Sequence, residues 1–240
     1  MLQTILPPCL ACLTPRTVEI RLRARWELSL RDPLRFLEWF VYTLDTHDPD
    51  RPIKPFPAHR PHIIAVTRLW QYNALMSLRK SRQMIMTWLF AALCLWDTLH
   101  KGKFTVQQSK RLEDAVGNEH AGDGPLGRSK FILNHIPGRK ALGLVEGDGF
   151  VKLATSVSFP KLNSLLLAIP QGGNIIRQRT VSGILSDESH FQDEFSDAYT
   201  GAMACIRGDK ASLAHLWFVS LSTANLGAAL DLHEDRLADR

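Results

Sequence analysis

The stretch KSRQMIMTW, from Lys80 to Trp88, lies between a short apolar run and a long apolar segment with helical character. A phosphate-binding loop needs backbone N–H groups around a concavity, a helix that begins there, a cation for the phosphates and a hydroxyl for Mg²⁺. Lys80 and Arg82 supply cations here, and Thr87 supplies a hydroxyl. The Gly-Lys pair that normally precedes the threonine is absent, because Ile85-Met86 stands in its place. The stretch therefore fits either a phosphate-binding loop with a displaced lysine or a basic loop that caps a buried helix.

A second candidate anchor lies about a hundred residues further on, where the apolar run that begins at Val181 ends in Asp187-Glu188. Open α/β folds bind ligands at the carboxyl ends of their strands, and the two carboxylates would lie there. Asp187 can hold Mg²⁺ through its water shell, and Glu188 can orient or deprotonate an attacking water. Taken alone, a strand that ends in Asp-Glu is common, and the alternative is a solvated strand end.

These segments, taken in order, resemble the ATPase domain of phage terminase large subunits, the motors that package DNA. The resemblance extends from Asp32 to Asn225. The motifs that carry it are Asp32-Pro33 to Phe56-Pro57, the deviant loop Lys80 to Met84 followed by Thr87-Trp88, Gln107 to Lys110 with Glu113 to Ala115, Ile169 to Gly173, Asp187-Glu188, and Ser220 to Asn225. Several ordered motifs are more specific than any one of them.

The resemblance implies an α/β P-loop NTPase-type domain in three layers, with a mostly parallel sheet and helices on both faces. It implies ATP and Mg²⁺ as cofactors and Glu188 as the catalytic residue. It places Mg²⁺ on Thr87 and Asp187. The expected ATP-binding residues are Lys80, Ser81, Arg82, Gln83, Met84, Ile85, Met86 and Thr87, with Gln71 as an adenine contact or an ordinary surface residue, and the expected coupling residues are Ser222, Thr223 and Asn225.

The implied activity is ATP hydrolysis that drives double-stranded DNA into a prohead. The implied partners are DNA, a portal protein, a small terminase subunit and further copies of the chain. Two alternatives stay open: a non-catalytic, truncated prophage remnant that retains the fold, and another nucleic-acid-stimulated P-loop ATPase. We expect a domain over 32–225, an extension over 1–31 and a charged tail over 226–240, with no nuclease domain and no nuclease activity.

The composition agrees with a folded, mildly basic protein. Hydrophobic residues make up 45% of the 240 residues, which excludes global disorder, and the net charge of +5 permits a polyanionic partner without requiring one. Cys9 and Cys12 form a Cys-x-x-Cys without a second ligand pair, so free thiols in a reducing compartment are expected rather than a zinc site. We find no secretion signal and no apolar run of about 20 residues, and we expect a protein of the host cytoplasm without membrane contact.

Hydrophobic spacing predicts the remaining elements. Asp32 should cap a helix that ends near Asp45, and the proline-rich stretch 47–61 should be an extended connector. The segment 18–30 fits a strand or a helix, and the glycine-rich segment 118–129 fits an insertion, a loop or local degeneration. Other helices are expected over 63–70, 87–99, 109–116 with Ser109 as N-cap, 131–136, 189–195 and 199–203, and strands over 74–78, 103–107, 150–154, 165–169, 181–188 and 215–221.

Overall fold

A seven-stranded sheet forms the centre of the computed structural model, which describes residues 15–80, 84–172, 176, 181–206 and 216–223. Five neighbouring strands run parallel, and the last two pair antiparallel at one edge. In spatial order the strands are β3 (Leu75–Lys80), β9 (Trp217–Thr223), β8 (Gly183–Ser186), β4 (Phe104–Gln108), β7 (Ser164–Ile169), β6 (Ser156–Phe159) and β5 (Val151–Lys152).

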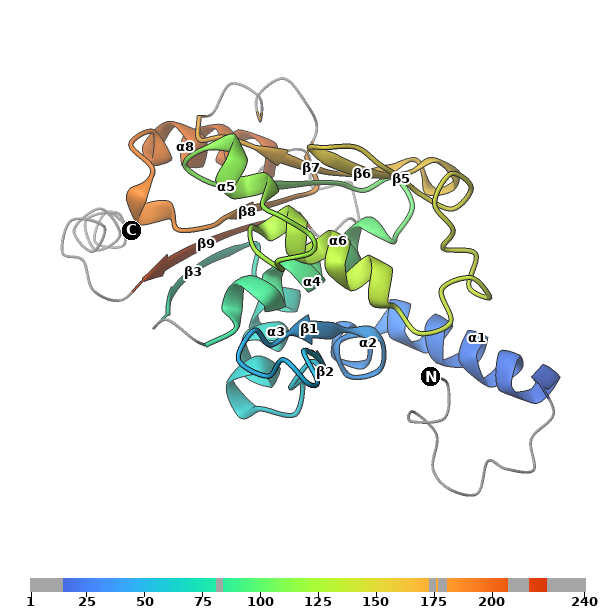
Figure 1. The fold of residues 1–240 in the computed structure, drawn as a ribbon. Coiled ribbons are helices and arrows are strands. Elements are labelled where there is room, and N and C mark those ends of the chain that lie inside the picture. The colour runs from blue at the N-terminus through green and yellow to red at the C-terminus, as the bar shows by residue number, and fades with distance from the viewer. Residues whose placement is uncertain (1–14, 81–83, 173–175, 177–180, 207–215, 224–240) are drawn as a thin grey trace.

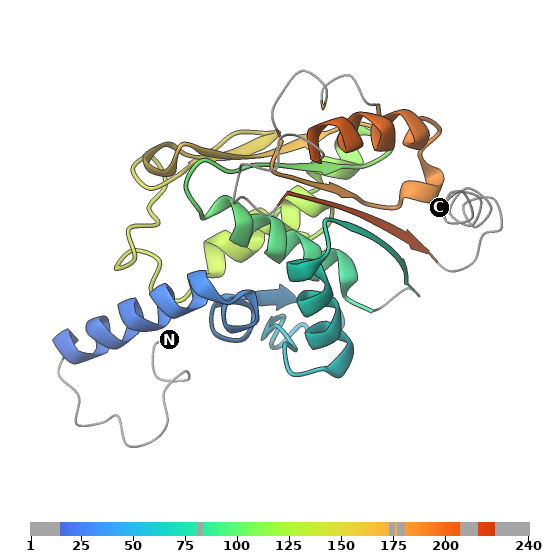
Figure 2. The same cartoon turned by 180° about the vertical axis from the view of Figure 1, so that it is seen from behind.

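Helices cover both faces of this sheet, as Figures 1 and 2 show. On one face, α8 (Phe195–Ile206) packs Ala198 and Ala202 against Val106, Ile184 and Phe218 of the strands. The other face carries the larger core. Its helices are α1 (Pro15–Arg31), α2 (Pro33–Phe40), α3 (Pro61–Tyr72), α4 (Met86–Thr98) and α6 (Pro125–His135). The predicted three-layer α/β architecture is therefore confirmed.

Helix α4 is buried on nearly every side, because it lies between the sheet and the helices of the larger core. Its residues Leu89 to Leu95 have no exposed surface. A helix that is apolar all round fits this central position and does not need a membrane. None of the helices in the described part of the chain has the length and hydropathy of a membrane span. Cys94, within α4, is a buried free thiol.

The structure corrects the prediction of one long helix from Asp32 to Asp45. Asp32 does cap α2, accepting a hydrogen bond from the Leu34 N–H at 3.1 Å, but the helix ends at Phe40. The next residues form β1 (Tyr42–Leu44), which pairs antiparallel with β2 (Ile53–Pro55). β-Branched and aromatic side chains favour the extended backbone here, so the helical spacing of Leu44 was coincidental.

Other boundaries also differ from the sequence prediction. Ser109 is not an N-cap, because α5 (Leu112–Val116) begins after Arg111. β3 is an edge strand with partly exposed residues rather than a buried one. Strand β6 was not predicted, and the expected helix over 189–195 is instead the 3₁₀ turn η4 (Ser189–Phe191) followed by a break before α8, which begins at Phe195. A second 3₁₀ turn, η3 (Pro160–Leu162), joins β6 to β7.

The segment 18–30 lies within the helix α1, which decides between the strand and the helix that the sequence left open. α1 packs its Trp26 edge-on against Phe36 and Phe40 of α2, with ring centroids 6.2 and 5.1 Å apart. The backbone oxygen of Ser29 accepts a hydrogen bond from Trp96 Nε1 at 2.8 Å. The end of α1 is thereby attached to the larger core.

Candidate nucleotide site at the carboxyl ends of the strands

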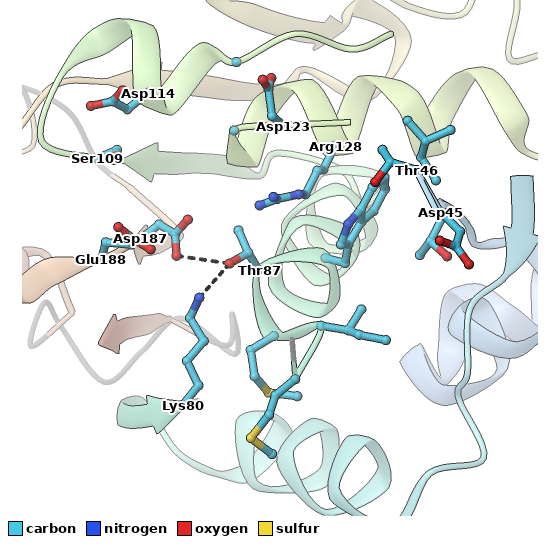
Figure 3. Close-up of a pocket in the computed structure, with 18 of the residues that line it drawn as sticks. Asp45, Thr46, Lys80, Thr87, Ser109, Asp114, Asp123, Arg128, Asp187 and Glu188 are labelled. Carbon is cyan, nitrogen blue, oxygen red and sulfur yellow. Dashed lines mark hydrogen bonds between the residues drawn. The ribbon is translucent and has the colours of Figure 1, made fainter. Parts of the chain in front are cut away.

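Three of the predicted site residues meet through direct hydrogen bonds. Lys80 Nζ donates to Thr87 Oγ1 at 3.0 Å, and that hydroxyl donates to Asp187 Oδ1 at 3.3 Å. Figure 3 shows the two hydrogen bonds that join Lys80 and Asp187 to Thr87. A cation, a hydroxyl and a carboxylate from three separate elements therefore converge on one point.

The sheet topology explains this convergence. Lys80 is the last residue of β3, and Asp187 directly follows β8, so both lie where parallel strands end. β9 runs between the two strands, pairing Ser220 with Ser186 on one side and Thr223 with Lys80 on the other. Thr87, the second residue of α4, lies at the positive end of a helix that begins at the same edge.

Asp187 lies in a largely dry environment, with 7% of its surface exposed. Burial raises the pKa of its carboxyl above the ordinary value, and the nearby cations Lys80 and Arg128 act in the opposite direction. The Thr87 hydroxyl also favours the carboxylate form through its hydrogen bond. A divalent cation at this point would stabilise the charged form of Asp187 in the same way as these groups do.

The backbone just before α4 is held in an unusual conformation. Ile85 has a φ of 59°, in the left-handed region, and the preceding Met84 and Ile85 itself pack against the larger core. For a β-branched residue this conformation costs roughly 1–3 kcal/mol. Ile85 occupies a position where the standard phosphate-binding pattern has glycine, so the chain adopts the turn without the residue that favours it.

Glu188 is exposed and also has a left-handed backbone, with a φ of 49°. Its side chain lines the same cavity as Asp187. The sharp turn after β8 thus directs Asp187 into the buried contact with Thr87 and leaves Glu188 accessible to a water molecule.

These residues line an open cavity of about 1370 Å³, larger than the usual 300–1,000 Å³ of a small-molecule site. One wall comes from the strand ends and α4, and the opposite wall comes from the β1–β2 hairpin, including Asp45 and Thr46 (Figure 3). The remaining lining residues of note are Lys54, Arg60, Trp88, Ser109, Lys110, Arg111, Asp114, Asp123 and Arg128.

Several of these residues were not predicted from the sequence to be part of the site. Arg128 lines the cavity near the start of α6, and its guanidinium lies over the ring of Trp88 with 5.6 Å to the centroid. The hairpin residue Lys54 also lines the cavity and pairs with Asp45 at 2.5 Å and Asp48 at 3.0 Å. The glycine-rich composition before Arg128 was the available signal, and it was interpreted as a loop or degeneration.

Some predicted residues do not reach the cavity. Gln71 accepts a hydrogen bond from Arg68 Nη1 at 2.7 Å and is absent from the lining residues. Ser222 is buried in β9, and Thr223 ends that strand. Ser81, Arg82, Gln83 and Asn225 lie outside the described residues.

The donor set suits Mg²⁺ chemically, because Thr87 and Asp187 offer the hydroxyl and carboxylate oxygens that this ion prefers. Over residues 15–80, 84–172, 176, 181–206 and 216–223, no group of three His, Cys, Asp or Glu side chains is placed to hold a metal by itself. Two protein oxygens with phosphate oxygens and water are the usual coordination of Mg²⁺ at a nucleotide.

Comparison with known proteins supports the fold. No protein-family model and no curated protein matches this sequence. Among solved structures, the large terminase of bacteriophage HK97 aligns with a TM-score of 0.55 and 16% identity, over 88% of this chain and 41% of that chain. The Phi-28 gp11 DNA packaging motor aligns with 13% identity over 71% of this chain and 52% of that one, at a TM-score of 0.36 that is too low to support a shared fold.

The chain therefore has an α/β fold of the P-loop NTPase type, with a mostly parallel sheet between helices. More particularly, it has a terminase-like fold, similar to that of the HK97 large terminase, and it spans less than half the length of that protein. The resemblance to terminase large subunits seen in the sequence is therefore confirmed as a similarity of fold.

Proposed function

We propose that this chain is an ATP-hydrolysing motor domain of a terminase-like large subunit, which drives double-stranded viral DNA into a prohead. The observation that carries the proposal is the contact of Lys80 and Asp187 with the same hydroxyl, that of Thr87. A solvated strand end or a basic capping loop would not need these three groups to meet. The terminase-like fold supports the particular motor class.

Each residue then has a defined task. Lys80, with Arg82, binds the phosphates, and Thr87 and Asp187 hold Mg²⁺. ATP with Mg²⁺ supplies a phosphoryl group whose transfer to water needs positioning and charge stabilisation more than covalent help. Glu188 orients the attacking water and accepts its proton.

β9 provides a route from the site to the rest of the domain. It lies between β3 and β8, with Thr223 paired to Lys80 on one side and Ser220 paired to Ser186, the residue before Asp187, on the other. We propose that Ser222 and Thr223, with Asn225, couple hydrolysis to movement.

DNA is the proposed polyanionic partner, held through its phosphate backbone with little sequence preference. The net charge of +5 is compatible with this role. Affinity should therefore fall as salt rises. We propose a portal protein, a small terminase subunit and further copies of this chain as the remaining partners, in the cytoplasm of the host cell.

The proposal is tested by measuring the rate of ATP hydrolysis by the purified chain, with and without double-stranded DNA. Glu188→Ala should bind ATP and lose turnover by roughly 10²–10⁴-fold, the usual contribution of a general base. Lys80→Ala should weaken ATP binding itself. Glu27→Ala on α1 and Lys161→Ala after β6 are matched exposed controls that should retain native turnover. Normal turnover in Glu188→Ala would refute the assigned base.

The non-catalytic remnant is the second candidate, and the residues at Ile85-Met86 favour it, because they replace the usual Gly-Lys pair. It predicts ATP binding that depends on Lys80 without turnover, even with DNA and a portal protein present. Stimulation by single-stranded rather than double-stranded DNA would instead favour the third reading, another nucleic-acid-stimulated ATPase.

A further inference from the structure

Arg128 is a cation at the candidate site that neither of the two anchor motifs contains. It lines the cavity together with Lys80, Thr87 and Asp187, and Figure 3 shows its guanidinium directed toward Thr87 and Asp187. Within the described residues the one hydrogen bond of its side chain uses Nε, which donates to the Gly122 oxygen at 3.0 Å. The terminal nitrogens Nη1 and Nη2 therefore remain available for a ligand in the cavity.

The glycine-rich segment is built tightly around this arginine. A Cβ at Gly122 would lie 2.9 Å from the ring of Trp88, the ring over which Arg128 lies. A Cβ at Gly117 or Gly124 would overlap the backbone of the facing part of the segment, at 2.1 and 2.6 Å. The glycines are thus required for close backbone approach, and the segment is a defined structure whose Gly122 oxygen holds Arg128 Nε beside the Trp88 ring.

The helix that carries Arg128, α6, is also attached to α4 and β4 through the neighbouring residue Ser129. Ser129 Oγ donates to the backbone oxygen of Ala91 in α4 at 2.9 Å and accepts from Gln107 Nε2 of β4 at 2.9 Å. Both partners are buried. The start of α6 is therefore tied to α4, whose first turn holds Thr87, so Arg128 and Thr87 keep a fixed relation.

The charges around Arg128 explain what it can bind. Asp187, Asp123 and Glu188 are the carboxylates that act on it, and burial lowers the pKa of its guanidinium despite them. Burial removes part of the water around the Arg128 guanidinium, which costs free energy, while the Trp88 ring beneath it attracts the charge. Phosphate oxygens are the natural ligand, because the planar fork of an arginine matches them through two parallel hydrogen bonds.

We propose that Arg128 binds the terminal phosphate of the nucleotide that Lys80 and Thr87 hold in the same chain. This inference rests on the proposed function, and it adds a phosphate-binding residue from the glycine-rich segment. Lys80 approaches from the β3 side and Arg128 from the α6 side, so the terminal phosphate lies between them. Arg128 then distinguishes ATP from ADP, because only ATP extends to it.

The test measures affinities for Mg²⁺-ADP and for a non-hydrolysable Mg²⁺-ATP analogue by calorimetry. Arg128→Ala should weaken binding of the analogue about 10- to 100-fold, the usual effect of losing charge-assisted hydrogen bonds, and should change ADP affinity less than about 3-fold. Arg128→Lys should give a smaller loss. Arg139→Ala is the control and should bind both nucleotides normally. Arg139 follows the same helix, and its Nη1 donates a hydrogen bond to Asn134 Oδ1.

The outcomes separate this inference from the proposed function. Equal weakening of ADP and analogue, or no weakening of either, would overturn the role of Arg128 while leaving the Lys80 site intact. A native chain that binds neither nucleotide would overturn both. Because the readout is the ratio of two affinities in a chain that still binds ADP, a variant that merely unfolds cannot imitate the expected result.

Discussion

Thr87 donates a hydrogen bond to Asp187 at 3.3 Å, although 100 residues separate the two along the chain. The same hydroxyl accepts from Lys80 Nζ. One side chain in the first turn of α4 thus joins the ends of two strands that are not neighbours in the sheet.

Thr87→Val should destabilise the protein by about 1–3 kcal/mol, because it keeps the shape but leaves the buried Asp187 carboxylate without its hydroxyl donor. Urea unfolding without nucleotide measures this. Thr67→Val is the control, since Thr67 is also buried but its hydroxyl bonds to the Ile63 oxygen of its own helix. Only Thr87→Val should also lose Mg²⁺-dependent nucleotide binding. Equal behaviour of the two variants in both assays would contradict the assigned role.

Gly122→Ala should destabilise the protein more than Gly102→Ala. Both glycines have a left-handed backbone, with φ of 62° and 73°, so both substitutions carry a strain of roughly 1–2 kcal/mol. A Cβ at Gly102 meets nothing within 4 Å, whereas one at Gly122 meets Trp88, adding about 1–3 kcal/mol of overpacking. Urea unfolding of both variants gives the difference. Equal losses of unfolding free energy would show that the glycine-rich segment moves away from Trp88 to accommodate the methyl group.

Lys54→Met should raise the pKa of Asp45 and of Asp48. In the native chain both pKa values are lowered below 3.8, first of all by hydrogen bonds from Lys54. For an acid whose folded pKa is lowered, the stabilisation is present above the unfolded pKa and is lost as pH falls through the folded pKa. The ion pairs should therefore support the hairpin at neutral pH, and this support should begin to fall below about pH 3.8 and be lost as pH passes through the lower folded pKa values.

Carboxyl-carbon NMR titration follows these two groups directly. Lys101→Met, in the exposed turn after α4, is the control and should leave both titrations at their native positions. If Asp45 and Asp48 titrate identically in the native chain and in Lys54→Met, the hairpin ion pairs do not form in solution.

Lys103→Met should destabilise the protein by about 3–5 kcal/mol, since it removes a cationic partner from a buried carboxylate. Lys103 Nζ lies 3.2 Å from Asp97 Oδ1, and the Asp97 side chain is only 3% exposed. Asp97 Oδ2 also accepts hydrogen bonds from Thr105 and Trp217, which tie α4 to β4 and β9. Lys103→Arg should retain most of the stability. A loss below about 1 kcal/mol in Lys103→Met, measured by urea unfolding, would show that these two neutral donors suffice.

The sequence indicated the strand-end anchors because their signals are local. An apolar run followed by Asp187-Glu188 predicts a strand end, and the continuous apolar stretch after Thr87 predicts a buried helix. Parallel strands bring such ends to one edge, so the meeting of Lys80, Thr87 and Asp187 follows from topology once the fold class is known.

The remaining parts of the site depend on contacts between distant segments. The position of Arg128 over Trp88 requires the glycines before it to approach the ring and each other, and no periodicity encodes that approach. The β1–β2 hairpin was missed for a different reason, because Val41 and Leu44 fit a helical spacing while their neighbours prefer an extended backbone. Tertiary pairing with Ile53–Pro55 decided between these preferences.

β9 sets the width of the candidate site. Adjacent strands lie about 4.8 Å apart, so the strand that separates β3 from β8 holds their ends roughly 10 Å apart. This gap is a property of backbone geometry and is independent of which side chains fill the loop above it. The spacing between the ends of β3 and β8 therefore does not depend on the Gly-Lys pair that Ile85-Met86 replaces. Cations from outside the loop can reach a ligand bound between these strand ends.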